Sequence, residues 1–352
     1  YYSVIGGWVI KYLVEYFRGN AKQLAEDGYF TDFISNGVST ELCFMAFCAF
    51  TLIIIFAGVQ NGIERVSKIM MPILIVLSVI IAVYSVTRPG ALAGVKYFLV
   101  PNVKNFSWMT VVSAMGQMFY SLSIAMGILI TFGSYMKKDT AIEDSTRNVE
   151  VFDTGIAIMA GLMIIPAVFA FSGGDPDTLQ AGPSLMFITI PKVFQNMGFG
   201  TVIGIVFFLL VLFAAVTSSI ALTESAVSTF EDELGWGRKK ATVLVGVIML
   251  ALGSLSSLGY GPLAGIKIIG MQFLDLFDFL TNSVMMPIAA LLTSLFVSRV
   301  VGIDKIEAEI IHGESAFRRK KVFVVMIKYL CPVFAIIILL SSVANALGWI
   351  KM

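Results

Sequence analysis

The sequence predicts an all-α polytopic membrane protein, and three observations lead to this fold class. Of its 352 residues, 58% are hydrophobic and only 13% are charged, which is roughly half the charged share of a soluble domain. The mean hydropathy is +0.89. Apolar stretches of about 18 residues or more recur along the chain, and each is long enough for a transmembrane helix.

From the N-terminus onwards, the apolar stretches predict nine transmembrane spans. They cover residues 1–17, 40–59, 69–87, 109–136, 151–172, 200–230, 240–259, 270–298 and 322–346. The first span begins at Tyr1 without a cap, a methionine or a flanking charge, so we expect further sequence upstream of it.

The polar connections predict the orientation. Connections 60–68, 137–150, 231–239 and 299–321 are rich in Lys and Arg, so the positive-inside rule places them in the cytoplasm. The other four, 18–39, 88–108, 173–199 and 260–269, are then expected outside. We therefore expect a multi-pass protein of the cell (inner) membrane. Segment 173–199 combines Gly and Pro with an apolar stretch, and it is either a lid over a pocket or an ordinary surface loop.

The span 109–136 is expected to break near its centre. Small and hydroxyl-bearing residues gather there, namely Ser121, Ser123, Ala125 and Gly127, together with the bulky side chains of Tyr120 and Met126. In hydrocarbon, backbone groups leave a helix only where they line a cavity or a ligand. Residues 120–127 are therefore the first candidate for contact with a transported solute.

Hydroxyl groups also gather inside the span 200–230. Thr217, Ser218 and Ser219 are consecutive, and Thr217 shares a helix face with Ala214. A hydroxyl and a carbonyl one turn apart offer the oxygen ligands that small, hard cations such as Na⁺ prefer. The alternative is that these hydroxyls only bond back to the carbonyl of residue i−4 or hold neighbouring helices together.

Acidic residues at membrane depth form a third candidate group. Asp153, Glu224, Asp275 and Asp278 lie within predicted spans, where an ionisable side chain is costly and indicates a function. Asp275 and Asp278 share a helix face near the external end, which suits a gate. The acids of 231–233 lie at a helix C-terminus, against its dipole, and either have a cationic partner or are solvated.

Other classes of protein are disfavoured. A net charge of +1 gives no support to nucleic-acid binding. Cys43, Cys48 and Cys331 lie in apolar stretches without metal or redox spacing, and His312, the single histidine, lies in a polar connection. We therefore expect neither an enzyme nor, since nothing repeats like a pore loop, a channel.

Four phrases carry a resemblance to a known family. They are NGIERVSKIMMP (61–72), RPGALAGVKYFLVP (88–101), GQMFYSLSIAMG (116–127) and VTSSIALTESAVSTFEDELGW (216–236). Together they resemble the neurotransmitter:sodium symporter family, in a bacterial amino-acid transporter form. The resemblance covers essentially the whole chain and implies the LeuT-type inverted-repeat fold with discontinuous helices. It further implies that residues 1–352 form a single transmembrane transporter domain, which starts in the family's third helix and lacks the first two.

Carried over by position, the resemblance implies a substrate site. Tyr2 matches the family tyrosine whose phenol bonds the substrate carboxylate. The residues that would enclose the rest of the substrate are Tyr120, Ser121, Ser123, Met126, Ser218 and Leu222.

The resemblance also implies two sodium sites and two gates. The first sodium site would contain Ser121 and Asp153, and the second would contain the Ala214 carbonyl with Thr217 and Ser218. The external gate carboxylate would be Asp278, and the internal gate would contain Asp232 and Tyr135. The arginine partners of both gates would lie in the helices that this sequence lacks.

Two positions depart from the family pattern. Asp153 stands where the family often has an asparagine, and a carboxylate there would supply the negative charge that chloride-dependent relatives take from a bound anion. We therefore expect no chloride requirement. Met126 stands where many relatives have phenylalanine, and its flexible thioether can accommodate varied apolar side chains.

The expected function is sodium-coupled symport of a neutral, hydrophobic or aromatic amino acid by alternating access. The expected partners are this small-molecule substrate, sodium ions and the lipid bilayer. Two alternatives stay open. One is a proton-coupled LeuT-fold transporter in which Asp153 or Glu224 carries a proton, and the other is a transport-inactive sensor or scaffold.

Overall fold

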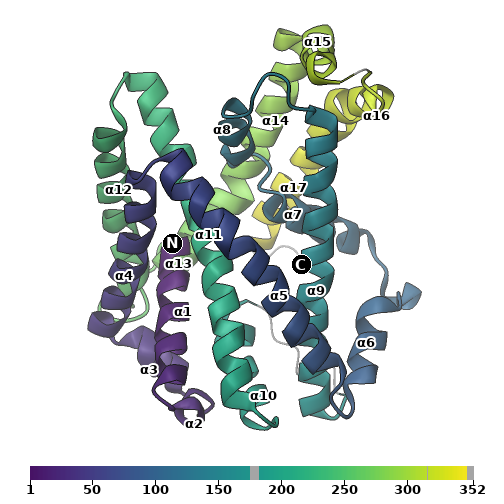
Figure 1. Ribbon diagram of the computed structural model, residues 1–352. Coiled ribbons are helices and arrows are strands. Elements are labelled where there is room, and N and C mark those ends of the chain that lie inside the picture. The colour runs from purple at the N-terminus through teal and green to yellow at the C-terminus, as the bar shows by residue number, and fades with distance from the viewer. Residues whose placement is uncertain (175–181, 315, 347–352) are drawn as a thin grey trace. The chain divides into compact units, whose positions relative to one another are not determined.

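The computed structural model describes residues 1–174, 182–314 and 316–346, and the regular elements in these residues are all helices. The helices belong to two compact units (Figure 1). The first unit comprises Tyr1–Asn102 and Ile156–Leu274, and the second comprises Val103–Gly155 and Asp275–Met352.

Eleven elements lie wholly within the first unit. They are α1 (Tyr2–Phe17), α2 (Ala21–Leu24), α3 (Tyr29–Ser35), α4 (Gly37–Phe56), η1 (Val59–Glu64), α5 (Arg65–Val86), α6 (Ala91–Leu99), η4 (Leu185–Thr189), α10 (Ile190–Gln195), α11 (Gly200–Leu234) and α12 (Arg238–Leu258). The long helix α9 (Ile142–Ser172) contributes to both units.

Helix α1 lies at the centre of the first unit, where it packs against α4 and α11, while α12 packs against α4 (Figure 1). Gly7 permits the close approach of α1 to α4, because a Cβ atom there would lie 2.7 Å from the backbone nitrogen of Phe44. Aromatic rings fill the space beside α1. Tyr12 stacks on Phe208 with ring centroids 5.2 Å apart, and its phenol donates to the carbonyl of Phe187 at 2.7 Å.

The middle of segment 182–199 is part of this core. Phe187, Ile190, Val193 and Phe194 are fully buried, so for these residues the prediction of an ordinary surface loop is wrong. An apolar stretch that contributes rings to the core cannot remain a solvated loop. Residues 175–181 of the predicted lid lie outside the described residues. Lys192 of α10 pairs with Asp27, and this pairing holds the pKa of the Asp27 carboxyl below its ordinary value.

The second unit contains the remaining helices. They are η2 (Val103–Asn105), α7 (Trp108–Ser121), α8 (Ile128–Ser134), η5 (Phe279–Met285), α14 (Met286–Phe296), η6 (Val297–Val301), α15 (Ile303–Gly313), α16 (Lys320–Val325), η7 (Met326–Leu330) and α17 (Cys331–Ala346). Helix α13 (Phe273–Asp278) begins at the boundary between the units. Helix α17 packs against both α14 and α7.

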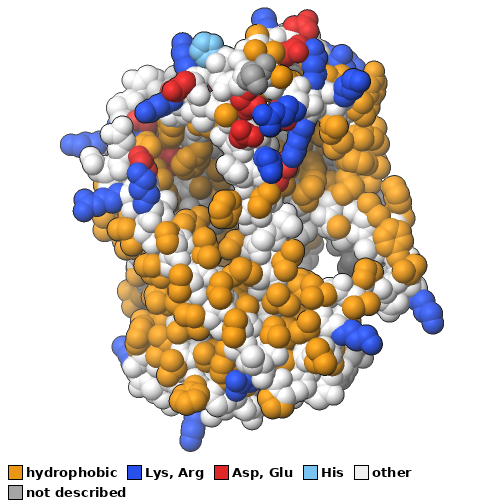
Figure 2. All heavy atoms as spheres, turned by 45° about the vertical axis from the view of Figure 1, so that its right-hand side comes forward, with side chains coloured by type: hydrophobic (Ala, Val, Ile, Leu, Met, Phe, Trp, Pro, Cys, Tyr) orange, Lys and Arg blue, Asp and Glu red, His pale blue; other side chains and the backbone are white. Residues whose placement is uncertain are grey.

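Charged side chains fasten one end of the second unit, and Figure 2 shows them gathered over the end that carries α15 and α16. Glu314 accepts hydrogen bonds from the first-turn N–H groups of α9, at 2.6 Å from Glu143. The Glu143 carboxylate in turn accepts from the backbone N–H groups of Arg318 and Arg319. Carboxylates thus satisfy helix-start donors that have no partner within their own helix.

Seven described helices are long and apolar enough to cross a membrane. They correspond to the predicted spans other than 1–17 and 109–136. The first of these is α1, which has 16 residues, and the second is divided between α7 and α8.

The predicted loop 60–68 is wrong, because a continuous helix runs over Val59–Val86. The break falls instead at Gly58, whose φ of 87° suits glycine. Polar residues after Gly58 do not interrupt a helix when they face water, and Lys68 pairs with Glu64 one turn away at 2.6 Å.

Candidate functional site

The break predicted in span 109–136 is confirmed in the second unit. Helix α7 starts at a capping box between Ser107 and Thr110 and ends at Ser121. The chain then turns through residues 122–127 before α8 begins. Ser123 and Ala125 have φ values of 53° and 63°, although neither is a glycine. Such conformations cost about 1–3 kcal/mol each and are concentrated at functional sites.

A short hydrogen bond lies at this break. The hydroxyl of Ser121 donates to Oδ1 of Asp153 at 2.6 Å. Asp153 is half-buried and comes from α9, which passes the end of α7 in the same unit. The last turn of α7 ends here, and backbone N–H groups of residues 122–124 donate to its carbonyls. A carboxylate, a hydroxyl and the negative end of a helix dipole therefore meet at one place, which suits a cation.

The other predicted residues of the broken helix lie on either side of Ser121. Tyr120 is 37% exposed, and Ser123 is half-buried. Met126 is also half-buried and packs against a small apolar cluster that contains Phe119 and Met286. Its side chain therefore belongs at least partly to the core of the second unit.

The two gate residues predicted in the second unit lie at helix ends. Tyr135 directly follows α8 and contacts the ring of Phe132, with centroids 6.1 Å apart. Asp278 ends α13, and its Oδ1 accepts from the amide of Asn282 at 2.7 Å. The amide thus fixes the carboxylate of Asp278 on its helix.

The predicted second sodium site lies on α11 in the first unit. The hydroxyl of Thr217 donates to the carbonyls of Ala214 at 3.0 Å and Phe213 at 3.1 Å. Because the single hydroxyl proton points at these carbonyls, the lone pairs of Oγ1 point away from the helix. The oxygens of Thr217 and Ala214 thus lie together, as the sequence predicts, and Ser218 beside them is exposed.

Tyr2 and Ser218 come together in the first unit, although 215 positions separate them in the chain. The Tyr2 phenol lies near the hydroxyl of Ser218, so the start of α1 meets the middle of α11. Leu222 lies one turn beyond Ser218 and is half-buried. Three predicted substrate residues therefore belong to one neighbourhood.

A buried ion pair joins α11 to the start of α12. Glu224 is fully buried, and both its oxygens accept from the guanidinium of Arg238, at 3.0 and 2.6 Å. Arg238 also donates to the carbonyl of Ile55 and lies 3.5 Å from Glu231. Among the acids of 231–233, Glu231 thus has the expected cationic partner. Asp232, the predicted gate residue, is exposed.

Sequence reasoning did not identify Arg238 as the partner of Glu224. A transmembrane span whose single charged residue is an acid requires a counter-charge, and Arg238 is the first arginine after the span 200–230. The sequence therefore contained the information needed to predict the pairing of Glu224 with Arg238.

Long apolar helices, one of them broken beside a carboxylate and several hydroxyls, define the class of a multi-pass helical transporter. The chain belongs to the sodium:neurotransmitter symporter family, whose model matches residues 8–349. This is a family of sodium-coupled transporters and not of enzymes.

Several known proteins are similar to this chain. A sodium-dependent transporter of Bacillus subtilis, YhdH, is 34% identical over 97% of this chain and 76% of its own length. One from Haemophilus influenzae is 31% identical over 97% of this chain and 75% of its own length. The crystal structure of MhsT in complex with L-phenylalanine matches with a TM-score of 0.84 and 34% identity, over 97% of this chain and 77% of that chain. The chain thus spans about three quarters of these relatives.

Proposed function

We propose that this sodium-coupled symporter carries a neutral amino acid with a hydrophobic or aromatic side chain. The observation that carries the proposal is the break between α7 and α8, with Ser121 bonded to Asp153 beside it. Unwound backbone in a membrane protein is tolerated where it faces a ligand or a cavity. The similarity to MhsT, which was crystallised with L-phenylalanine, supports the choice of substrate.

Candidate substrate contacts are proposed in each unit, taken by itself. In the first unit, Tyr2 and Ser218 offer hydroxyl groups for the amino-acid carboxylate, and Leu222 offers apolar surface. In the second unit, Tyr120, Ser121, Ser123 and Met126 lie along the break. None of these side chains carries a charge that would select a charged amino acid.

Two sodium sites are proposed, one in each unit. The second site consists of the Ala214 carbonyl with the hydroxyls of Thr217 and Ser218, and the orientation of the Thr217 proton supports it. The first site consists of Ser121 and Asp153. Since Asp153 brings its own negative charge to that site, we propose that transport does not require chloride.

The remaining assignments follow from the same proposal. Asp278 is the external gate residue, Asp232 and Tyr135 belong to the internal gate, and residues 1–352 act as one transporter domain in the cell (inner) membrane. A proton-coupled transporter is the second candidate. The pairing of Glu224 with Arg238 disfavours it, because both oxygens of this acid already have a partner.

A binding screen of the twenty amino acids, with and without Na⁺, tests the proposal. We expect one or a few neutral apolar or aromatic amino acids to bind in Na⁺ and not in choline. Sodium-independent binding that rises with proton concentration would favour the proton-coupled candidate. Binding without uptake into vesicles under a sodium gradient would favour a sensor.

A further inference from the structure

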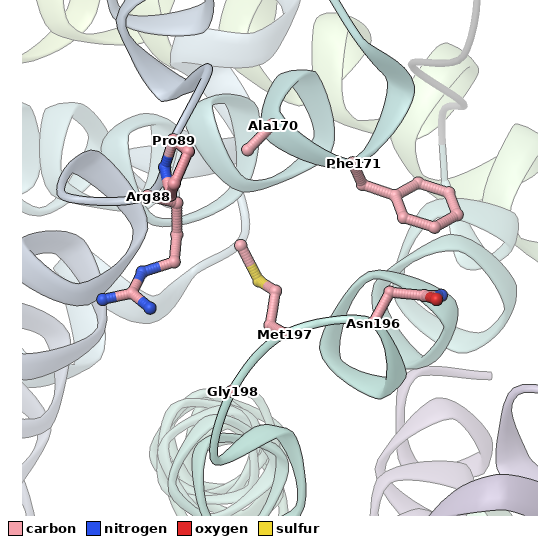
Figure 3. A pocket seen from close by; sticks show the side chains of 7 residues that line it. All are labelled: Arg88, Pro89, Ala170, Phe171, Asn196, Met197 and Gly198. Carbon is pink, nitrogen blue, oxygen red and sulfur yellow. The ribbon is translucent and has the colours of Figure 1, made fainter.

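A cavity of about 370 Å³ lies where three spans of the first unit end (Figure 3). Its walls are Arg88 and Pro89 just after α5, Ala170 and Phe171 in the last turns of α9, and 196–198 before α11. All three helices are long and apolar enough to cross the membrane. The cavity therefore lies at the boundary between hydrocarbon and water, away from the proposed substrate and sodium residues of α11.

Arg88 is the charged residue in the cavity wall, and Tyr84 holds it in place. Its Nε donates to the carbonyl of Tyr84 at 3.2 Å, and its guanidinium carbon lies 4.2 Å from the centroid of the Tyr84 ring. The Tyr84 phenol donates to the carbonyl of Gly198, which fastens α5 to the loop before α11. The ring that supports the guanidinium is therefore itself immobilised.

The two terminal amino groups of Arg88 have no acceptor among the residues that the structure describes, and no carboxylate is among the lining residues. A guanidinium presents paired N–H donors that match two oxygens of a phosphate or carboxylate. The cavity thus provides a fixed cation with free donors, which is a site for an anion.

Apolar side chains line part of the cavity beside Arg88, and exposed aromatic rings continue from it onto the surface. The thioether of Met197 points into the space between Arg88 and Phe171 (Figure 3). Phe199, directly after the lining residues, is 83% exposed, and Phe171 itself is 43% exposed. A free inorganic anion gains nothing from such surroundings, whereas the acyl chains of a lipid gain contact with them.

We propose that this cavity binds the phosphate of an anionic phospholipid, with the phosphodiester on Arg88 and the upper acyl chain against Met197 and Phe171. The volume falls in the range of small-molecule sites, which is roughly 300–1,000 Å³. Asn196 adds a second polar contact. Its amide NH₂ donates to the carbonyl of Lys192 at 2.8 Å, which leaves its oxygen to accept from a head-group hydroxyl. Phosphatidylglycerol is therefore the probe of choice.

The test compares phosphatidylglycerol with phosphatidylcholine on the purified transporter in nanodiscs, using a fluorescent analogue of each lipid. We expect Arg88→Gln to weaken phosphatidylglycerol binding by about tenfold, as the loss of a charge-assisted hydrogen-bonded pair predicts. Phosphatidylcholine binding should fall less, because the quaternary ammonium of its head group offsets the charge of its phosphodiester. Lys267→Gln is the matched control, since Lys267 is an exposed cation of the same unit outside the cavity, and it should bind as the wild type does.

Two further measurements separate this proposal from its alternatives. Met197→Trp keeps Arg88 but fills the cavity, and we expect it to reduce phosphatidylglycerol binding as well, in protein that elutes as the wild type does. Inorganic phosphate and glycerol 1-phosphate should displace the lipid only at concentrations at least about a hundredfold higher, because they lack acyl chains. Equal binding by the wild type and Arg88→Gln, full binding by Met197→Trp, or displacement by free phosphate at the concentration of the lipid would each overturn the proposal.

Discussion

The hydroxyl of Ser121 donates a hydrogen bond of 2.6 Å to the carboxylate of Asp153, at the point where α7 ends. This contact joins the last helical residue before the break to the neighbouring helix α9. It also brings a negative charge to the carbonyl end of α7, where the helix dipole is already negative. Two negative groups at one place are stabilised by a cation between them, and this relationship leads to the first prediction.

The first prediction concerns chloride. We expect uptake by the wild type to be the same with chloride or gluconate as the anion. In Asp153→Asn the carboxylate charge is lost, and two unit charges about 4 Å apart interact by roughly 4 kcal/mol at an effective dielectric of 20. Uptake by this variant should therefore be lost, or should return only with chloride.

The control for this prediction is Asp144→Asn, which makes the same charge change at an exposed position in the first turn of α9. Uptake by the control should be normal in either salt. If Asp153→Asn also transports normally in both salts, then Asp153 is a solvated acid on α9 and not part of a sodium site.

The second prediction concerns the oxygens of α11. Replacing both Thr217 and Ser218 by alanine removes two hydroxyls and slightly raises helix propensity. We expect sodium affinity to fall by on the order of tenfold or more, because each contact of a polar group with a charge contributes roughly 1.5–3 kcal/mol. Sodium-dependent binding of the substrate measures this directly.

Thr229→Ala tests whether the loss of a back-bonded hydroxyl is itself harmful, since Thr229 donates to the carbonyl of Ser225 on the same helix. Sodium affinity should be unaffected by this change. An unaltered sodium affinity in the Thr217/Ser218 double variant would mean that these hydroxyls serve only the helix.

The features that the sequence predicted correctly are local. The break after Ser121 follows from small and hydroxyl residues within eight positions, and the convergence of Thr217 with Ala214 follows from helical spacing alone. The extent of α5 was not predicted, because hydropathy identifies the buried part of a helix and not its solvated first turns.

Contacts between distant segments could not be derived from patterns in the sequence. Only the resemblance to a family associated Tyr2 with the substrate site, and its proximity to Ser218 depends on how α1 packs against α11. The burial of segment 185–195 depends on rings contributed by α1 and α11. The pattern of apolar residues within the segment does not indicate which helices it packs against.

The third prediction concerns the buried pair of Glu224 and Arg238. Arg238→Met leaves a fully buried carboxylate without its partner, and breaking such a pair typically costs about 3–5 kcal/mol. We expect a clear drop in the apparent Tm of the purified protein. The double variant Glu224→Leu with Arg238→Met should recover most of the loss, because apolar residues can replace a buried pair.

The control is Lys239→Met, which changes an exposed neighbour of Arg238 and should leave Tm unchanged. A double variant as unstable as the single one would contradict this account.

The fourth prediction concerns the backbone of the break. Gly127 has a φ of 77°, so Gly127→Ala should cost about 1–2 kcal/mol in stability. Ala125→Gly should be neutral or stabilising, since Ala125 already has a φ of 63°. Gly116→Ala is the control, because it lies inside α7 with open space around it and should raise helix propensity. Thermal unfolding of the three variants measures these differences, and equal effects of the alanines at 116 and 127 would contradict the geometry.

The last prediction concerns Tyr2, whose phenol meets Ser218 at the start of α1. Tyr2→Phe keeps the ring and removes one hydroxyl, so the packing of α1 should survive. If the phenol also bonds the substrate carboxylate, its loss removes a hydrogen bond to a charged group, which contributes roughly 1.5–3 kcal/mol. Substrate affinity should then fall by on the order of tenfold or more, while apparent Tm changes little.

Tyr1→Phe removes the adjacent phenol and should leave substrate affinity unchanged. A substrate analogue without the carboxylate separates the two roles of Tyr2, since the wild type and Tyr2→Phe should bind it equally weakly. If Tyr2→Phe retains full affinity for the amino acid, Tyr2 is a packing residue that holds α1 against α11, and the carboxylate is bound elsewhere.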